Sequence, residues 1–217
     1  MVEEKCLKRD LFGEVRLQDA AGEPIIVRDT ATAPWWTRPV ARWLLAREAR
    51  ALAALDGIDG VPELLAQERD YLARSYLAGQ PLYRAKPRDA RWFGEAARLL
   101  RRLHRAGVCH NDLAKEPNLL VREDGTPGLI DFQLAWFSPR RSRLFRVAAY
   151  EDLRHLLKHK RTYRTDRLTA REKRILARPS PVSRLYMKTV KPVYLFVTRR
   201  LLGWADREGA ADRNIRD

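Results

Sequence analysis

A polar loop between two short apolar segments is the feature that most restricts how this chain can fold. The loop runs from His110 to Asn118 and contains Asp112, and a further carboxylate, Asp131, ends the next apolar run. A turn signal, Asp124-Gly125, lies between them, so the region reads as a strand, a turn and a strand. Chance easily supplies either half of this pattern, but rarely both in this order. We therefore expect the carboxylates of Asp112 and Asp131 and the carboxamide of Asn118 to lie close together at neighbouring strands.

The residues before this loop predict a small antiparallel sheet with one helix. Leu11–Leu17 and Ile25–Arg28 have strand character and are separated by a turn at residues 19–22. Apolar residues recur at helical spacing from about Val40 to Leu55, and Leu64–Leu77 predicts two further short strands. The expected order is β-β-β-α-β-β.

The second half of the chain predicts a mainly helical unit around the polar loop. We expect a helix from about Ala90 to Ala106, ended by Gly107, then a strand at Gly128–Phe132 and a helical pattern from Ala148 onward. The predicted fold class is α+β. The two parts are residues 1–78 and residues 79–217, with their boundary near Gly79.

Cysteine content and hydropathy predict the compartment. Cys6 and Cys109 are too few for a disulfide framework, which favours a reducing, cytoplasmic environment. The first residues lack the layout of a secretory signal, and no run approaches the roughly 18 apolar residues of a membrane-spanning helix. We expect a soluble protein or one that is peripheral at a membrane.

Positive charge is concentrated in the last third of the chain. Residues 1–137 contain 21 Lys or Arg and 20 Asp or Glu, whereas residues 138–217 contain 22 and 8. This asymmetry indicates an anionic partner or, alternatively, a solvated basic face of ordinary helices.

Two aromatic and basic regions each have two interpretations. The segment Val182–Trp204 can lie on an anionic membrane as a basic amphipathic helix, or it can pack its apolar side on the protein, which we favour. Trp35, Trp36 and Trp43 likewise read as interfacial anchors or as packing residues.

The residues from Leu103 to Leu113 (Leu-His-Arg-Ala-Gly-Val-Cys-His-Asn-Asp-Leu) resemble the "L-H-x-x-G-x-x-H-x-D-L" motif of the protein-kinase-like superfamily. Over roughly residues 5–160, the chain is similar in style to the RIO kinases and the bacterial lipopolysaccharide-core sugar kinases. The resemblance implies a bilobal fold. Residues 1–78 would form an N-lobe that covers ATP, and residues 79–217 a C-lobe with the catalytic loop, the metal-binding strand and a basic helical C-terminal segment.

The resemblance also implies roles for the polar loop. Asp112 would orient the acceptor hydroxyl and accept its proton, because a carboxylate can accept that hydrogen bond while it stays negative. Asn118 and Asp131 would bind Mg²⁺ through oxygen atoms. Lys115 would lie towards the γ-phosphate of ATP, and His110 would brace the loop.

Further residues match the nucleotide-binding half of the superfamily less closely. Gly13 and Val15 stand where its glycine-rich loop would cover the phosphates. Arg28 takes the position of the lysine in "V-A-I-K", and Glu48 that of the glutamate that orients it; the alternative is an ordinary surface pair. Finally, Tyr76 and Leu77 would offer backbone groups to adenine.

Four departures from the superfamily pattern bear on activity rather than on fold. Arg28 replaces a lysine, Asn111 replaces an arginine, and Gln133 replaces a glycine. In addition, the spacing from Asp112 to Asn118 is one residue longer than usual. A pseudokinase that binds or scaffolds without transferring phosphate is therefore an alternative to an active kinase.

The acceptor is open between two classes. Phosphorylation of serine or threonine in a protein comes first, and phosphorylation of a lipopolysaccharide core sugar (Kdo or heptose) is the alternative. The basic C-terminal third fits an acidic protein or an anionic glycolipid at the inner membrane face. A nucleic-acid partner has only the charge in its favour.

The helix after residue 148 carries three further residues of interest. Asp152 is either the buried acid that fixes the catalytic loop in related kinases or an acid near a helix N-terminus, favoured by the helix dipole. His155 and His159 have metal-like spacing, but without a third ligand we expect a solvated basic face.

Overall fold

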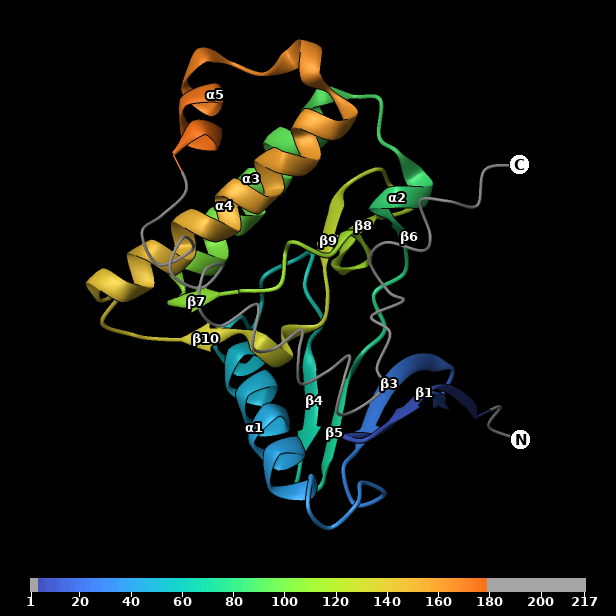
Figure 1. Ribbon diagram of the computed structural model, residues 1–217. Coiled ribbons are helices and arrows are strands. Elements are labelled where there is room, and N and C mark those ends of the chain that lie inside the picture. Colours follow the sequence, from blue (N-terminus) through green and yellow to red (C-terminus); the bar gives the residue numbers. More distant parts are fainter. Residues whose placement is uncertain (1–3, 179–217) are drawn as a thin grey trace, which may run out of the picture.

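The computed structural model describes residues 4–178, which form a mixed α+β fold (Figure 1). The N-terminal part forms one antiparallel sheet in the order β1-β2-β3-β5-β4, with helix α1 between its third and fourth strands in sequence. The predicted β-β-β-α-β-β order is confirmed. Its elements are β1 Lys5–Asp10, β2 Gly13–Ala20, β3 Glu23–Asp29, α1 Arg38–Ala54, β4 Leu64–Gln67 and β5 Tyr71–Ser75.

The first predicted strand was placed too early. Leu11 and Phe12 form the turn between β1 and β2. The Asp10 side chain stabilises this turn by accepting a hydrogen bond of 2.7 Å from the backbone N–H of Phe12. The two apolar residues resemble the start of a strand in sequence, although they belong to a turn.

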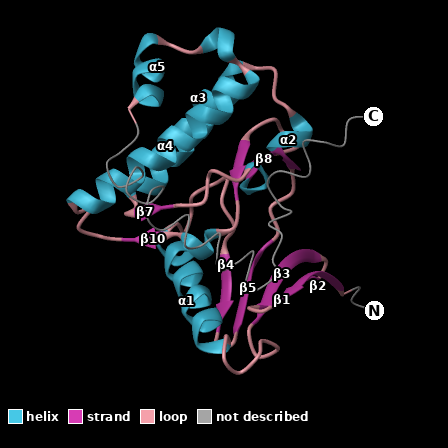
Figure 2. Ribbon diagram, viewed as in Figure 1, coloured by secondary structure: helices cyan, strands magenta, loops and turns pink. Residues whose placement is uncertain are grey.

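The C-terminal part surrounds two helices with short strands and turns (Figure 2). Strands β7 and β10 pair with each other, and β6, β8 and β9 form a second small sheet. The strands are β6 Gln80–Pro81, β7 Val108–Cys109, β8 Leu119–Val121, β9 Pro127–Leu129 and β10 Trp136–Phe137. The helices are α2 Leu82–Ala85, α3 Ala90–Arg105, η1 Glu116–Asn118, η2 Phe132–Leu134, α4 Arg143–Tyr163, η3 Thr165–Arg167 and α5 Ala170–Ala177.

Two boundaries in this part differ from the prediction. Helix α4 begins five residues before Ala148, because Ser142 caps it by accepting a hydrogen bond of 3.3 Å from the N–H of Phe145. The strand predicted at Gly128–Phe132 ends at Leu129, because Asp131 has a left-handed backbone conformation that begins η2. The α+β class itself is confirmed.

Gly13 has a packing reason to be glycine. It has φ of +111°, and a Cβ atom there would overlap the carbonyl oxygen of Asp29 on β3. Gly22 also has a positive φ, of +90°, but a Cβ atom there would meet nothing within 4 Å. Substitution of Gly22 would therefore cause backbone strain alone, whereas substitution of Gly13 would cause both strain and steric overlap.

We expect Gly13→Ala to destabilise the fold by more than about 3 kcal/mol, since strain and overlap add. The matched control Gly22→Ala carries the strain alone and should cost about 1–2 kcal/mol. Urea unfolding of the two variants measures the difference. Equal losses would contradict the close packing of Gly13 on β3.

The tryptophans near the start of α1 are exposed rather than packed. The exposed fractions are 82% for Trp35, 54% for Trp36 and 52% for Trp43. The packing interpretation is therefore wrong, and the membrane-anchor interpretation stays a prediction. No helix within residues 4–178 has the length and apolar character to cross a bilayer. The segment Val182–Trp204 lies outside the described residues.

Candidate active site

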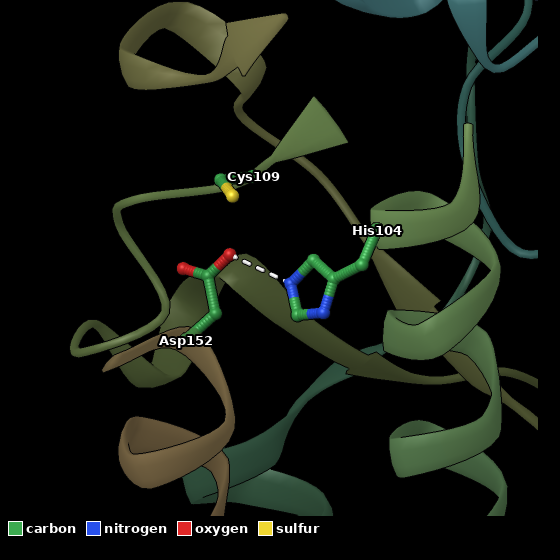
Figure 3. Close-up of side chains that lie close together, drawn as sticks. All are labelled: His104, Cys109 and Asp152. Atoms are coloured by element: carbon green, nitrogen blue, oxygen red, sulfur yellow. Dashed lines mark hydrogen bonds and ion pairs between the residues drawn. The ribbon is translucent and has the colours of Figure 1, made fainter. Parts of the chain in front are cut away.

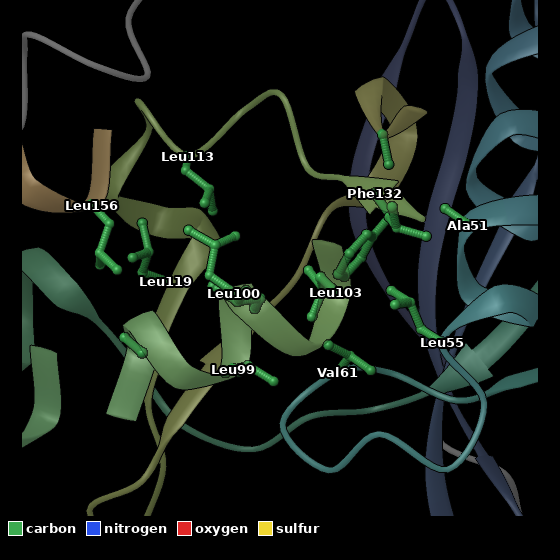
Figure 4. Close-up of a cluster of buried hydrophobic side chains, with 14 of the residues drawn as sticks. Ala51, Leu55, Val61, Leu99, Leu100, Leu103, Leu113, Leu119, Phe132 and Leu156 are labelled. Carbon is green, nitrogen blue, oxygen red and sulfur yellow. The ribbon is translucent and has the colours of Figure 1, made fainter. Parts of the chain in front are cut away.

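Three of the predicted polar site residues are each followed by a buried apolar residue. Leu113 follows Asp112, Leu119 follows Asn118, and Phe132 follows Asp131; their exposed fractions are 1%, 0% and 0%. All three belong to one hydrophobic cluster with residues of α1 and α3 (Figure 4). Burial of these side chains fixes the neighbouring polar groups at the surface of the core.

Asp152 holds the start of the catalytic loop from helix α4. Its carboxylate, 1% exposed, accepts hydrogen bonds of 2.8 Å from the backbone N–H groups of both His110 and Asn111. Of the two interpretations of Asp152, the structure supports the buried acid that fixes the loop. Asn111 has φ of +63°, a conformation that this pair of hydrogen bonds helps to hold.

His104 and Cys109 complete the surroundings of Asp152 (Figure 3). Nε2 of His104 lies 3.2 Å from Oδ2 of Asp152, and one ligand atom from each of the three residues falls within 4.8 Å of the others. Burial, with the nearby Asp152 carboxylate, raises the pKa of Cys109, so its thiol stays protonated. With both oxygens of Asp152 engaged by the loop, the cluster reads as structural support rather than as a metal site.

Asp112 and its neighbours form the centre of the candidate site. Oδ2 of Asp112 lies 3.1 Å from Nζ of Lys115 and accepts a hydrogen bond of 3.0 Å from Nδ2 of Asn118. The same Nδ2 donates to the backbone carbonyl of Asp112 at 2.9 Å. The amide nitrogen of Asn118 is thus used within the loop, so a bound metal ion would be held by its amide oxygen.

The loop has a second anchor on α4, and Asn118 lies within hydrogen-bond distance of Asp112. Nε2 of His159 lies 2.8 Å from the carbonyl oxygen of Leu113, and the hydroxyl of Tyr163 donates to the carboxylate of Glu116. Glu116 therefore points to α4 while Lys115 points to Asp112. Asp152, His159 and Tyr163 together hold both ends of the loop.

The pKa of Asp112 is raised above its ordinary value. Burial is the main cause, and the negative charge of Asp131 adds to it, whereas Lys115 and His110 act in the opposite direction. Asp112 and Asp131 are thus close enough to repel each other. A cation between them would relieve that repulsion.

Asp131 itself has a strained backbone, with φ of +66° and ψ of +70°. Such conformations of non-glycine residues gather at functional sites. Gln133, which replaces a glycine of the superfamily motif, has no positive φ in this structure and lies inside η2. The substitution of this glycine therefore imposes no strain on the backbone here.

Glu48 is buried, with an exposed fraction of 2%, between two arginines. Its Oε1 lies 3.1 Å from Nε of Arg74, and its Oε2 lies 3.6 Å from NH1 of Arg28. Oε2 has no hydrogen-bond partner among the described residues. The structure thus places Arg28 beside Glu48, as predicted, but it makes Arg74 the nearer partner and leaves Arg28 less tightly held.

The remaining predicted nucleotide contacts lie along the N-terminal sheet. Val15 pairs with Arg28 across β2 and β3. The backbone N–H of Tyr76 donates to the carbonyl of Pro24 at 3.2 Å, so it belongs to the protein's own hydrogen bonds. Leu77 is the next residue and is the better candidate for a backbone contact with adenine. Gly13 is packed on β3, and its predicted contact with phosphates stays a prediction.

Arg47 ties helix α1 to the segment that carries Asp131. Its guanidinium donates to the carbonyl oxygens of Leu134 at 2.9 Å and of Ala135 at 2.9 Å. Since Glu48 is the next residue on α1, this contact sets the position of Glu48 relative to Asp131.

The histidines of α4 do not form the solvated basic face that the sequence predicted. His159 is 7% exposed and His155 is partly buried. Burial, together with the positive charge of Lys158, lowers the pKa of His155 to about 4, so it is neutral at physiological pH. Its Nδ1 has no hydrogen-bond partner among the described residues.

His155 should make the fold sensitive to acid. Its pKa is about 4 in the folded chain and 6.5 as a reference for the unfolded chain, so the unfolded state takes up a proton first as pH falls. The contribution is fully present above pH 6.5 and is lost progressively towards pH 4, to a total of about 3 kcal/mol. Unfolding by urea across this range should show a smaller loss for His155→Leu; identical pH profiles would contradict this assignment.

The donor set fits Mg²⁺ and ATP. The oxygen of Asn118 and the carboxylate of Asp131 are hard ligands of the kind that Mg²⁺ prefers. Arg28 offers a guanidinium that can pair with phosphate, and its partner Glu48 does not hold it through a hydrogen bond.

Sequence reasoning missed the residues that hold the site from a distance in the chain. Sequence reasoning did not single out Arg74 as a partner of Glu48, although strand alternation with Leu72 places both side chains on one face of β5. No local pattern indicates that His159 and Tyr163 reach the catalytic loop.

Comparison of the sequence with family models and with curated proteins finds no match. Among solved structures, the chain is similar to the Rio2 kinase from Chaetomium thermophilum, with a TM-score of 0.58 and 18% identity over 83% of this chain and 60% of that one. For the complex of that kinase with ADP/Mg²⁺ and phosphoaspartate, the TM-score is 0.56 and the identity 17%, over 83% and 58%. The chain thus spans less than two thirds of the Rio2 kinase chains. The likeness shows a protein-kinase-like fold, as predicted.

Proposed function

We propose that the protein is an ATP- and Mg²⁺-dependent phosphotransferase that acts on a hydroxyl acceptor. The observation that carries the proposal is the convergence of Asp112, Asn118 and Asp131 on one strained, doubly anchored loop region. The complex of the similar Rio2 kinase with ADP and Mg²⁺ supports the choice of cofactors.

Each site residue has a separate role in the proposed phosphoryl transfer. Asn118 and Asp131 would hold Mg²⁺, and the bound ion would neutralise charge on the phosphates. Arg28 contacts the phosphates, while Lys115 compensates the charge around Asp112. Asp112 accepts the proton of the acceptor hydroxyl, whose oxygen forms a bond to the γ-phosphorus as the bond to the β,γ-bridging oxygen breaks.

The acceptor is the finer part of the proposal. A protein serine or threonine comes first, and a lipopolysaccharide core sugar is the alternative. Only residues 138–142 separate β10 from α4. So short a connection leaves little chain to bind an extended peptide, and this observation keeps the sugar as the alternative. The cytoplasmic location and the contact of the basic C-terminal segment with an anionic membrane stay predictions.

The test is transfer of label from γ-labelled ATP in the presence of Mg²⁺. Label is sought in the protein itself, in generic protein substrates and in extracted lipopolysaccharide, beside Asp131→Asn. Hydroxylamine treatment separates phosphoaspartate, which it cleaves, from phosphoserine and phosphothreonine. Transfer that disappears in the variant supports the proposal and identifies the acceptor class. Retained nucleotide binding without any transfer would favour the pseudokinase, for which the replacement of lysine by Arg28 is the main observation.

A further inference from the structure

A second, strongly basic pocket lies away from the candidate active site. It has a volume of about 520 Å³ and is lined by residues from the C-terminal end of α3 and the N-terminal end of α4. These two helix ends lie near β7 (Figure 1). The polar lining consists of five arginines and one histidine, contributed by α3, by the loop before α4 and by the first turn of α4: Arg101, His104, Arg105, Arg140, Arg141 and Arg146. None of these residues belongs to the predicted nucleotide site.

The five arginines have no partner in the described part of the protein. No carboxylate lines the pocket, and none of their guanidinium groups forms an ion pair or a side-chain hydrogen bond within residues 4–178. By contrast, Arg98 on the same helix pairs with Glu95 at 3.3 Å. The pocket thus gathers five arginines that have no carboxylate partner within residues 4–178 around one volume.

This arrangement costs stability. Arg101 and Arg105 are four residues apart on α3, a spacing at which like charges repel by a few tenths of a kcal/mol. Arg141 has φ of +43°, which is unfavourable for any residue other than glycine. The N-terminal end of α4 adds a partial positive charge of its own. A compact anion in the pocket would neutralise the guanidinium groups and the partial charge of the helix end together.

We propose that this arginine pocket binds a phosphate group, either free or as part of a larger molecule. Guanidinium groups bind phosphate oxygens in pairs of parallel hydrogen bonds, and five of them around one small volume match a compact polyanion better than a singly charged carboxylate. The buried side chain of Phe145 also lines the pocket.

The pocket also adjoins the support of the catalytic loop. His104 lines it and lies 3.2 Å from Asp152, the residue that holds the backbone of His110 and Asn111. A phosphate bound there would therefore sit one side chain away from the anchor of the loop.

Thermal unfolding with inorganic pyrophosphate, without Mg²⁺ and with EDTA, tests the proposal. The melting temperature of the wild type should rise with pyrophosphate concentration, as expected for a ligand of the folded state. The double variant Arg101→Gln/Arg141→Gln should show an apparent affinity at least about tenfold weaker, because two of the charged donors are removed. Without ligand, this variant should melt at or above the temperature of the wild type.

Two control variants locate the effect. Arg91→Gln changes an exposed arginine at the other end of α3 and should keep the wild-type response. Arg28→Gln should keep it as well, because Arg28 belongs to the nucleotide site. A response that is equal in wild type and double variant, or that is lost in Arg28→Gln, would overturn the proposal.

A second experiment distinguishes a phosphate of a lipid headgroup from a phosphate of a soluble molecule. Co-sedimentation with phosphatidylcholine vesicles, with and without phosphatidic acid, tests a lipid headgroup. Dependence of vesicle binding on Arg101 and Arg141, without a response to pyrophosphate, would assign the site to a headgroup. A pyrophosphate response with the same dependence would assign it to a soluble phosphate, and no response in either arm would contradict the site.

Discussion

Asp112→Asn is expected to lower the rate of phosphoryl transfer by about 10²–10⁴-fold, the usual contribution of a general base. An amide has almost the shape of the carboxylate and can still contact Asn118, but it cannot accept the proton of the acceptor hydroxyl. Because Asn118 and Asp131 remain, the affinity for Mg²⁺ and ATP should change little. Single-turnover transfer and calorimetric binding of ATP measure the two quantities separately.

The matched control for this prediction is Asp56→Asn, which changes an exposed carboxylate and should leave transfer unaffected. The pH profile gives a second readout. Burial and Asp131 raise the pKa of Asp112, so the acid limb of the wild-type profile should lie above the ordinary range of an aspartate. Transfer by Asp112→Asn at the wild-type rate would show that this carboxylate is not the base.

Asp152→Ala is expected to destabilise the fold by about 3–5 kcal/mol and to abolish ordered packing of the catalytic loop. The change leaves the buried N–H groups of His110 and Asn111 without their acceptor, and it removes the contact of His104. Urea unfolding measures the stability, and hydrogen exchange at the two N–H groups measures the local effect.

Asp166→Ala is the appropriate comparison for Asp152→Ala. Asp166 also contacts a cation, Arg164, but its side chain is 60% exposed, so its loss should destabilise the fold far less than the loss of Asp152. If the two variants unfolded at the same urea concentration, or if the N–H groups of His110 and Asn111 exchanged as slowly as in the wild type, Asp152 would not be the anchor of the loop.

The grouping of the polar residues at the candidate site could be predicted from the sequence because its information is local. Asp112 and Asn118 lie in one loop, Asp131 follows one turn later, and each is next to an apolar residue that the core must bury. The order of the N-terminal elements along the chain could be predicted for a similar reason, since alternation and turn residues act over a few positions. The exact start of β2 could not, because the turn at Leu11 and Phe12 depends on the Asp10 side chain.

The supporting contacts could not be predicted, because they join residues that are far apart in the chain. His159 reaches Leu113 over 46 residues, and Arg74, the nearer arginine on Glu48, lies on β5 whereas Glu48 lies on α1. The arginine pocket is a further case. Its cations come from α3, from the loop before α4 and from α4 itself, and in the sequence they look like ordinary solvated charge.

Binding of ATP by calorimetry, with and without Mg²⁺, tests the central claim most directly, because it does not depend on knowing the acceptor. The claim is that Asn118 and Asp131 hold Mg²⁺ on a nucleotide beside Asp112. The wild type should bind ATP more tightly with Mg²⁺ than without it, and Asp131→Asn should lose that difference while keeping its fold. No ATP binding by the wild type, or equal dependence on Mg²⁺ in wild type and variant, would contradict the claim.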